Sequence, residues 1–272
     1  MSETFDAAWL GLREEVDHQS RVVGLLPLLS EWWTATGRST VLDLGCGTGS
    51  NLRYLEPKLP HPQSWTLVDH DDALLANIEA PSRDVAVNLV RGDLAGPGLA
   101  EVRRAHLVTA SALLDLVSEA WLRDLVEACV SAGCGALFAL TYDGTIEWSE
   151  CDDPMDALVR DAVNAHQRRD KGLGPALGPT GGRITEQLFQ KRGYRTWLLP
   201  SAWRLGAKEV ALVEALISGW ADAAVEQLPA EADGVRAWAD RRRAAVANGD
   251  VDLVVGHQDL LALPSDLVAE SA

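Results

Sequence analysis

Three glycines at alternate positions, Gly45, Gly47 and Gly49, follow the short apolar run Val41–Leu44 and precede a segment that favours a helix from Ser50. The apolar run predicts a buried parallel strand. Glycines let a ligand approach the backbone closely, and the free N–H groups at a helix start favour a ligand rich in acceptors. Asp43, two residues before Gly45, suits a cationic ligand better than a pyrophosphate. The segment therefore predicts a site for an amino acid joined to a nucleoside, with an ammonium or sulfonium charge.

The glycine spacing is G-x-G-x-G, which differs from the G-x-G-x-x-G of dinucleotide-binding folds. The run Asp-Leu-Gly-Cys-Gly-Thr-Gly at residues 43–49 resembles motif I of the class I S-adenosylmethionine-dependent methyltransferases. This resemblance implies S-adenosylmethionine as cofactor and S-adenosylhomocysteine as product. In this segment it implies cofactor contacts for Asp43, Gly45, Cys46, Gly47, Gly49 and Asn51.

A second strand is predicted at Trp65–Val68, and it ends in Asp69. Asp69 comes twenty residues after Gly49, the offset at which an acid reaches ribose hydroxyls. The resemblance implies that Asp69 binds the ribose and that His70 lies beside the adenine. A solvated loop carboxylate is the structural alternative for Asp69.

Two more strands carry the later family motifs. Asp93 and Leu94 follow the β-rich run Val85–Val90, and the resemblance implies that the Asp93 carboxylate accepts from the adenine amino group near the Leu94 N–H. Ser111 follows the apolar run Leu107–Ala110. The resemblance implies that the fourth family motif lies here and faces both the cofactor and the acceptor. Four ordered motifs thus lie between about residues 40 and 145.

The composition argues against polyanionic substrates. The chain of 272 residues has 24 Lys plus Arg and 40 Asp plus Glu, a formal net charge of −16. Nucleic-acid binders usually carry a basic stripe, so a small-molecule acceptor is predicted and nucleic acid is disfavoured. No apolar run is long enough for a bilayer, no signal-peptide pattern is present, and the four cysteines show no zinc-ligand spacing. We therefore expect a cytoplasmic protein with no metal site and no membrane association.

Strands that alternate with helices predict an α/β fold. With the resemblance, we expect a Rossmann-like, doubly wound, seven-stranded sheet, mostly parallel with an antiparallel last strand and helices on both faces. A single domain is expected over 1–272. Its expected parts are an N-terminal helical cap (1–36), a cofactor-binding core (37–145), a variable segment with a lid loop (146–182), and a C-terminal part with added helices and the last strands (183–272).

Candidates for the acceptor side come from the ends of strands and from the variable segment. His166 is the candidate base because its ordinary pKa lies near neutrality, and Asp115 and Tyr142 follow the fourth strand and end the fifth. Arg13, on the predicted N-terminal helix, is the candidate partner of the cofactor carboxylate. An exposed helical histidine and a surface ion pair are the structural alternatives for His166 and Arg13. The glycine-rich segment 168–182 is expected to close over substrate.

Three functional hypotheses follow. The first is methyl transfer from S-adenosylmethionine to a small molecule by in-line displacement. The second is an RNA-modifying methyltransferase, and the third is a non-catalytic protein that binds S-adenosylmethionine and partners another protein. A nicotinamide-dependent reductase fits poorly, because the glycine spacing differs and Ile146, not lysine, stands four residues after Tyr142.

Overall fold

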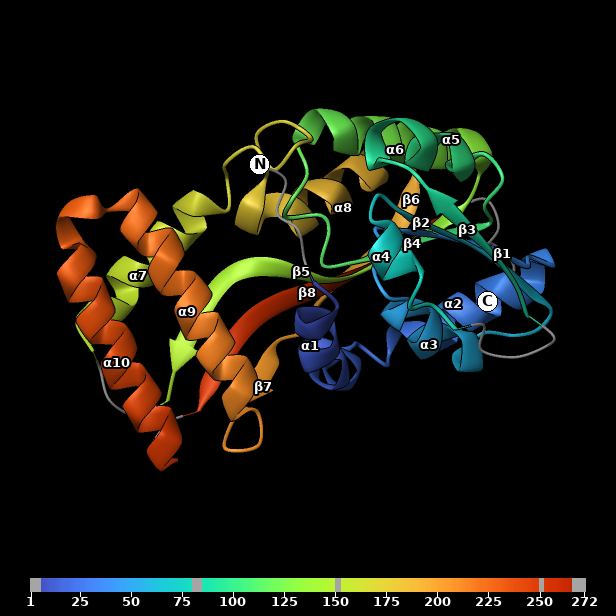
Figure 1. Cartoon of the computed structure of the whole chain (residues 1–272). Helices are drawn as coiled ribbons and strands as arrows, with labels where there is room; N and C mark the ends of the chain where they lie inside the picture. Colours follow the sequence, from blue (N-terminus) through green and yellow to red (C-terminus); the bar gives the residue numbers. More distant parts are fainter. Residues whose placement is uncertain (1–5, 80–84, 150–152, 250–251, 266–272) are drawn as a thin grey trace.

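Eight strands form one sheet in the computed structural model, which describes residues 6–79, 85–149, 153–249 and 252–265. The strands are β1 (Thr40–Leu44), β2 (Gln63–Asp69), β3 (Val85–Arg91), β4 (Leu107–Ser111), β5 (Gly135–Trp148), β6 (Tyr194–Pro200), β7 (Trp203–Leu205) and β8 (Leu253–Pro264). Their order is β3-β2-β1-β4-β5-β8-β6, and the short β7 pairs with β8 (Figure 1). β1 to β5 are parallel, whereas β8 is antiparallel to β5, β6 and β7.

Helices cover both faces of this sheet (Figure 1). α2 (Leu25–Thr36) and α3 (Ser50–Leu55) bury leucine and tryptophan side chains against one face. α5 (Leu99–Val102), α6 (Glu119–Ala132) and α8 (Gly181–Lys191) bury apolar side chains against the other face. Strands that are buried on both faces explain why β1 and β4 read as continuous apolar runs. The layered α/β architecture and the antiparallel last strand are confirmed.

Several predicted elements differ from the structure in extent. The expected N-terminal helical cap (1–36) contains two helices, α1 (Ala7–Ser20) and α2, because the chain extends at Arg21. The sheet contains seven strands along its main path, as predicted, and in addition β7, which no pattern indicated. Residues 1–5 of the expected helical cap lie outside the described residues.

Strands β5 and β8 are long, with 14 and 12 residues. A second lobe is built on the C-terminal half of β5 and the N-terminal half of β8 that pairs with it. These halves form an antiparallel ribbon that leaves the sheet, and α7 (Met155–His166), α9 (Val210–Gln227) and α10 (Ala232–Asn248) pack beside it (Figure 1). The pairing of β5 with β8 shifts register between Phe138 and Thr141 and again between Tyr142 and Ile146. Each bulge bends the ribbon and increases its twist.

The interior of this lobe contains an ion pair. Arg242 of α10 is buried, and its guanidinium donates to the carboxylate of Asp156 in α7. The Trp238 Nε1–H donates to the same carboxylate at 2.7 Å, and the Arg242 guanidinium stacks over the Trp148 ring. Asp156 therefore joins α7 to α10 through two donors.

Among the described residues, no helix has both the length and the apolar character needed to cross a membrane.

Candidate active site

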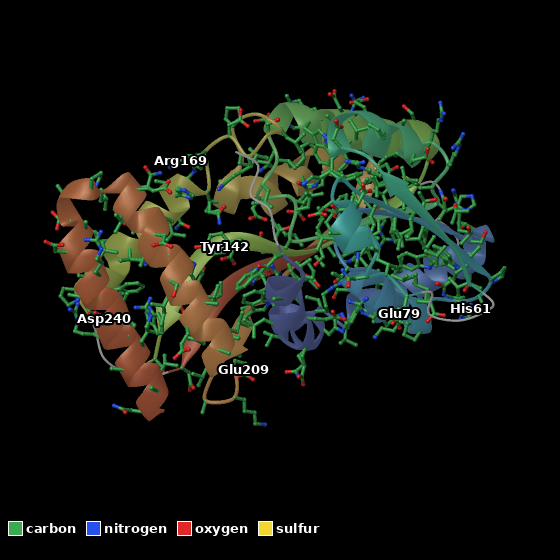
Figure 2. All side chains as sticks on the ribbon, in the orientation of Figure 1. His61, Glu79, Tyr142, Arg169, Glu209 and Asp240 are labelled. Carbon is green, nitrogen blue, oxygen red and sulfur yellow. The ribbon has the colours of Figure 1, made fainter. Side chains whose placement is uncertain are left out.

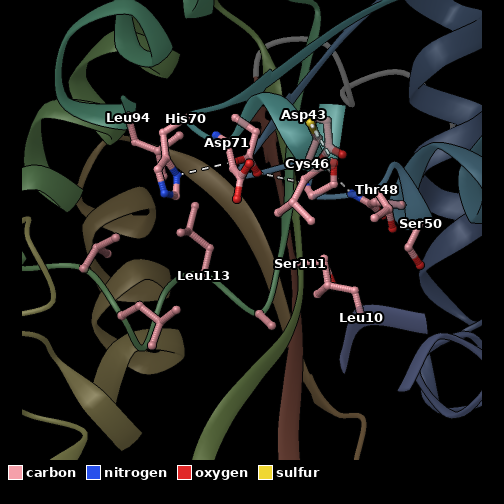
Figure 3. Close-up of a pocket in the computed structure, with 18 of the residues that line it drawn as sticks. Leu10, Asp43, Cys46, Thr48, Ser50, His70, Asp71, Leu94, Ser111 and Leu113 are labelled. Carbon is pink, nitrogen blue, oxygen red and sulfur yellow. Dashed lines mark hydrogen bonds and ion pairs between the residues drawn. The ribbon is translucent and has the colours of Figure 1, made fainter. Parts of the chain in front are cut away.

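A cavity of about 350 Å³ lies at the carboxyl ends of the parallel strands (Figure 3). This is the edge at which open α/β sheets bind ligands. Of the twelve residues predicted to contact the cofactor, all except Gly49 line the cavity. Those that do are Arg13, Asp43, Gly45, Cys46, Gly47, Asn51, Asp69, His70, Asp93, Leu94 and Ser111.

The glycine loop is fixed to the end of β2. The Gly45 N–H donates to the Val68 carbonyl at 2.9 Å, and the Gly47 N–H donates to Asp69 Oδ2 at 2.8 Å. The Asp71 N–H donates to Asp69 Oδ1 at 3.0 Å. A carboxylate oxygen has a second lone pair, so Asp69 can still accept from two hydroxyls. The loop and the acid after β2 are thus held as one unit.

Two glycines of the loop have different reasons for being glycine. Gly47 has a φ of +54°, and a Cβ there would lie 3.0 Å from the Leu10 side chain. Gly49 has a φ of +82° at the N-terminal cap of α3, and a Cβ there would lie 3.3 Å from Ile78. Gly49 does not line the cavity, so its role is to turn the chain into α3.

Asp43 is a deeply buried acid of the cavity, with 1% of its surface exposed. Its Oδ1 accepts from Asn51 Nδ2 at 2.9 Å, and the same amide donates to Thr109 Oγ1 at 2.8 Å. Its Oδ2 is buried and has no hydrogen-bond partner among the described residues. Burial raises the pKa of Asp43 to about 7. An acid with a free oxygen and an unfavourable buried charge fits a cationic ligand.

The residues after β3 also lie where the motif order predicts. Asp93 Oδ1 accepts from the Gly96 N–H at 2.8 Å, which holds the turn after β3. The Leu94 carbonyl accepts from Trp121 Nε1–H at 3.1 Å, which attaches this turn to α6. Asp93 and His70 both line the cavity, and Figure 3 shows His70 beside Leu94.

Helix α1 covers the cavity. Leu10, Arg13 and Asp17 line it, and the Arg13 guanidinium donates to the Asp17 carboxylate at 2.8 and 3.1 Å. The same guanidinium lies 4.8 Å from the centre of the Trp203 ring. Arg13 therefore lies at the predicted cavity, but one edge of its guanidinium is already occupied by Asp17.

An apolar wall faces the cofactor motifs and was not predicted. It consists of Leu10 from α1, Ala112, Leu113, Leu116 and Val117 from the turn after β4, and Leu173 from the variable segment. The apolar character of 112–117 was visible in the sequence. Its direction towards the cavity was not, because it depends on the turn after Ser111, where Ala112 has a φ of 52°.

The three residues predicted for catalysis do not line the cavity. Tyr142 is buried in the second lobe, and its hydroxyl donates to Asn164 at 2.9 Å (Figure 2). His166 pairs with Glu226 of α9 at 3.3 Å, and burial lowers its pKa. Asp115 is buried, and its carbonyl accepts from the Gly178 N–H at 2.9 Å. The structure does not bring the three residues together with the cofactor motifs.

The variable segment touches the cavity at its tip only. Lys171, Gly172 and Leu173 line the cavity. The Leu177 N–H donates to the Val117 carbonyl at 2.9 Å, so the later part of the segment is fixed to the turn after β4. A Cβ on Gly181 would lie 2.4 Å from the Leu114 carbonyl oxygen, which shows how closely the two segments pack. The lid stays a prediction, and residues 171–173 are the part of the described segment to which it applies.

Residues 41–132 match the family model described as a methyltransferase domain. No curated protein matches the chain. Among solved structures, the chain is similar to YjhP from E. coli, at 15% identity and a TM-score of 0.47 over 95% of this chain and 100% of that one. It is also similar to two S-adenosylmethionine-dependent methyltransferases solved with S-adenosylhomocysteine. The one from Geobacter sulfurreducens has 14% identity and a TM-score of 0.43 over 93% and 98% of the two chains. The one from Thiobacillus denitrificans has 14% identity and a TM-score of 0.45 over 96% and 100%.

The matched residues contain the glycine loop, Asp69, Asp93 and Ser111, which line one cavity. Residues 41–132 are thus similar to a methyltransferase domain, and they carry four motifs in order at the carboxyl edge of the sheet.

Proposed function

We propose that this enzyme methylates a small, largely apolar acceptor. The observation that carries the proposal is that the cofactor motifs and an apolar wall share one cavity of about 350 Å³. Such a volume is typical of small-molecule sites. The net charge of −16 further disfavours a polyanionic acceptor.

Within the cavity we assign the cofactor by its chemistry. Asp43 would bind the ammonium group, Asp69 the ribose hydroxyls, and Asp93 the adenine amino group, with His70 and Leu94 beside the ring. The unpartnered Oδ2 of Asp43 supports the first assignment. Bound S-adenosylmethionine supplies an electrophilic methyl group.

The contribution of the protein to the reaction would then be alignment and exclusion of water. The wall formed by Leu10, Leu113, Leu116, Val117 and Leu173 has no ionisable side chain. Apolar walls hold an acceptor in line with the donor and keep competing water out. The geometry favours an acceptor that needs little help from a base, since the predicted base His166 faces α9 instead.

Asp69→Ala is expected to weaken S-adenosylhomocysteine binding by about 2–4 kcal/mol, because two charge-assisted hydrogen bonds to the ribose would be lost. Isothermal titration calorimetry measures this change directly. Asp72→Ala is the matched control, since Asp72 lies three residues away and pairs with Arg91 at the surface. Equal affinities of Asp69→Ala and the wild type for S-adenosylhomocysteine would show that Asp69 does not bind the ribose.

Hydrogen exchange tests the lid. Amides of 170–174 are expected to exchange more slowly when S-adenosylhomocysteine and the acceptor are bound, whereas those of 176–178 should change little. The reason is that Leu177 and Gly178 already donate to the turn after β4 in the free protein. Unchanged exchange at 170–174 would argue against a lid there.

Transfer of a labelled methyl group separates the three functional hypotheses. Protein, methyl-labelled S-adenosylmethionine and a bacterial extract are incubated, and the product is divided into small molecules, RNA and protein. Label in the organic-soluble small-molecule fraction supports the proposal. Label in RNA, with binding that weakens steeply with salt, would replace it with the RNA-modifying function. Cofactor binding without any labelled product would favour the non-catalytic hypothesis.

A further inference from the structure

A series of buried polar side chains runs from the end of α1 to the cavity. Arg21 Nη1 donates to Asn51 Oδ1 at 2.9 Å, and Asn51 Nδ2 donates to Asp43 Oδ1 at 2.9 Å. All three side chains are buried. Asp43 and Asn51 line the cavity, whereas Arg21 does not. A charged group outside the cavity is thus connected to the acid inside it.

Asp259, in β8, holds Arg21 in place from the other side. Its Oδ2 lies 3.5 Å from Arg21 Nε and accepts from the Val22 N–H at 2.9 Å. Its Oδ1 accepts from the Leu140 N–H at 2.8 Å. The Arg21 guanidinium also lies 4.5 Å from the centre of the Tyr54 ring. The position of Arg21 is therefore fixed by an ion pair and an aromatic ring.

The charges in this cluster do not balance. Two buried carboxylates, Asp43 and Asp259, lie around one guanidinium, and Asp69 adds a further carboxylate near Asp43. Buried charges are stable when they are paired. The cluster can therefore take one more positive charge, and Asp43 Oδ2, which accepts no hydrogen bond from the described part of the chain, is the atom available to it.

We propose that Arg21 is a positioning residue for cofactor binding, which orients Asp43 through Asn51 and compensates its charge so that Asp43 binds the cofactor ammonium as a carboxylate. This inference rests on the cofactor placement proposed above. Arg21 itself does not line the cavity, so its effect on the ligand passes through Asn51 and Asp43.

The electrostatics give the proposal a pH dependence. Burial raises the pKa of Asp43 to about 7, the hydrogen bond from Asn51 and the charge of Arg21 oppose this rise, and the charge of Asp69 adds to it. The other groups that face Asp43 are the buried Cys46 thiol and the neutral Thr109 hydroxyl. A protonated Asp43 attracts an ammonium group less, so affinity should fall as the pH drops through about 7. Without Arg21 this loss should begin at a higher pH.

Calorimetric titrations of Arg21→Met between pH 6 and 9 test this with three probes. S-adenosylhomocysteine and decarboxylated S-adenosylmethionine carry the ammonium, and 5′-methylthioadenosine lacks both ammonium and carboxylate. For the first two, Arg21→Met should lose about fivefold in affinity at pH 7, because a rise of about one in the pKa of Asp43 from about 7 lowers its ionised fraction from about one half to about one tenth. Affinity for 5′-methylthioadenosine should stay within about twofold. Arg21→Lys should restore most of the affinity, because it restores the charge.

Asp259→Asn is expected to shift the pH dependence of binding in the opposite direction from Arg21→Met. Removing this carboxylate leaves the Arg21 charge to act on Asp43 alone, so the pH at which S-adenosylhomocysteine affinity falls should move below that of the wild type. An unchanged pH profile in both variants, or an equal loss of all three probes in Arg21→Met, would overturn the proposal. If wild-type protein binds none of the three probes, the cofactor placement itself is wrong.

Discussion

Asp43→Asn is expected to make the free protein more stable and, at the same time, unable to bind S-adenosylmethionine tightly. The wild-type carboxylate is fully buried with one oxygen unpartnered, and burial raises its pKa from 3.8 to about 7. An asparagine keeps the acceptor for Asn51 and removes the buried charge. We expect a gain of about 2–4 kcal/mol in the free energy of unfolding at pH 8.

The sign of the pH dependence follows from proton binding. Folded Asp43 keeps its proton over a range in which the unfolded chain has already lost it. The stability of the wild type therefore falls as the pH rises from about 4 to about 7, and the difference from Asp43→Asn grows over that window. Urea unfolding at pH 5 and pH 8 measures it, and calorimetry should show at least a tenfold weaker S-adenosylmethionine affinity at pH 8.

The exposed Asp72→Asn is the control for general charge effects, and we expect its stability to stay within about 0.5 kcal/mol of the wild type. If Asp43→Asn were less stable than the wild type at pH 8, the Asp43 carboxylate would stabilise the folded protein, which contradicts the prediction.

Asp156→Ala should destabilise the second lobe by about 3 kcal/mol. The substitution removes the carboxylate that accepts from the buried Arg242 guanidinium and from Trp238 Nε1–H. Removing one partner of a buried pair is costly because the remaining charge loses the attraction and the hydrogen bonds of that partner. Chemical denaturation followed by tryptophan fluorescence is a suitable measurement, since Trp148 and Trp238 lie at the pair.

The same helix α10 offers a matched control. Arg236 pairs with Asp233 at 3.2 Å, and both side chains are well exposed. Asp233→Ala should change the stability by less than about 0.5 kcal/mol. Similar losses of unfolding free energy in Asp156→Ala and Asp233→Ala would show that the ion pair with Arg242 stabilises the lobe no more than an exposed pair does.

The grouping of the residues predicted to contact the cofactor could be inferred from the sequence because these residues lie close to strand ends. The glycine loop, Asp69 and Asp93 each follow a strand directly, and parallel strands bring these ends to one edge. The acceptor half depends on long-range pairing. Two bulges against β8 bend β5 away from the sheet and take Tyr142 into the second lobe, and no pattern within β5 indicates them.

The same distinction applies to Arg21. Arg21 follows Arg13 and Asp17 at steps of four residues, which places the three side chains on one helix face. The partner that buries it, Asp259, lies more than two hundred residues away. Sequence patterns of one helix cannot reveal such a pair, because it exists only after β8 has entered the sheet.

The position of β8 near the end of the chain determines when the other strands can pair during synthesis. A ribosome makes β5, β6 and β7 before β8, yet β6 and β7 pair with β8 alone in the described sheet. During synthesis the glycine loop and β1 to β5 can assemble first. β6 and β7 stay unpaired until β8 has been synthesised. Exposed unpaired edges are prone to aggregation, so the nascent chain is most vulnerable between the emergence of β6 and that of β8.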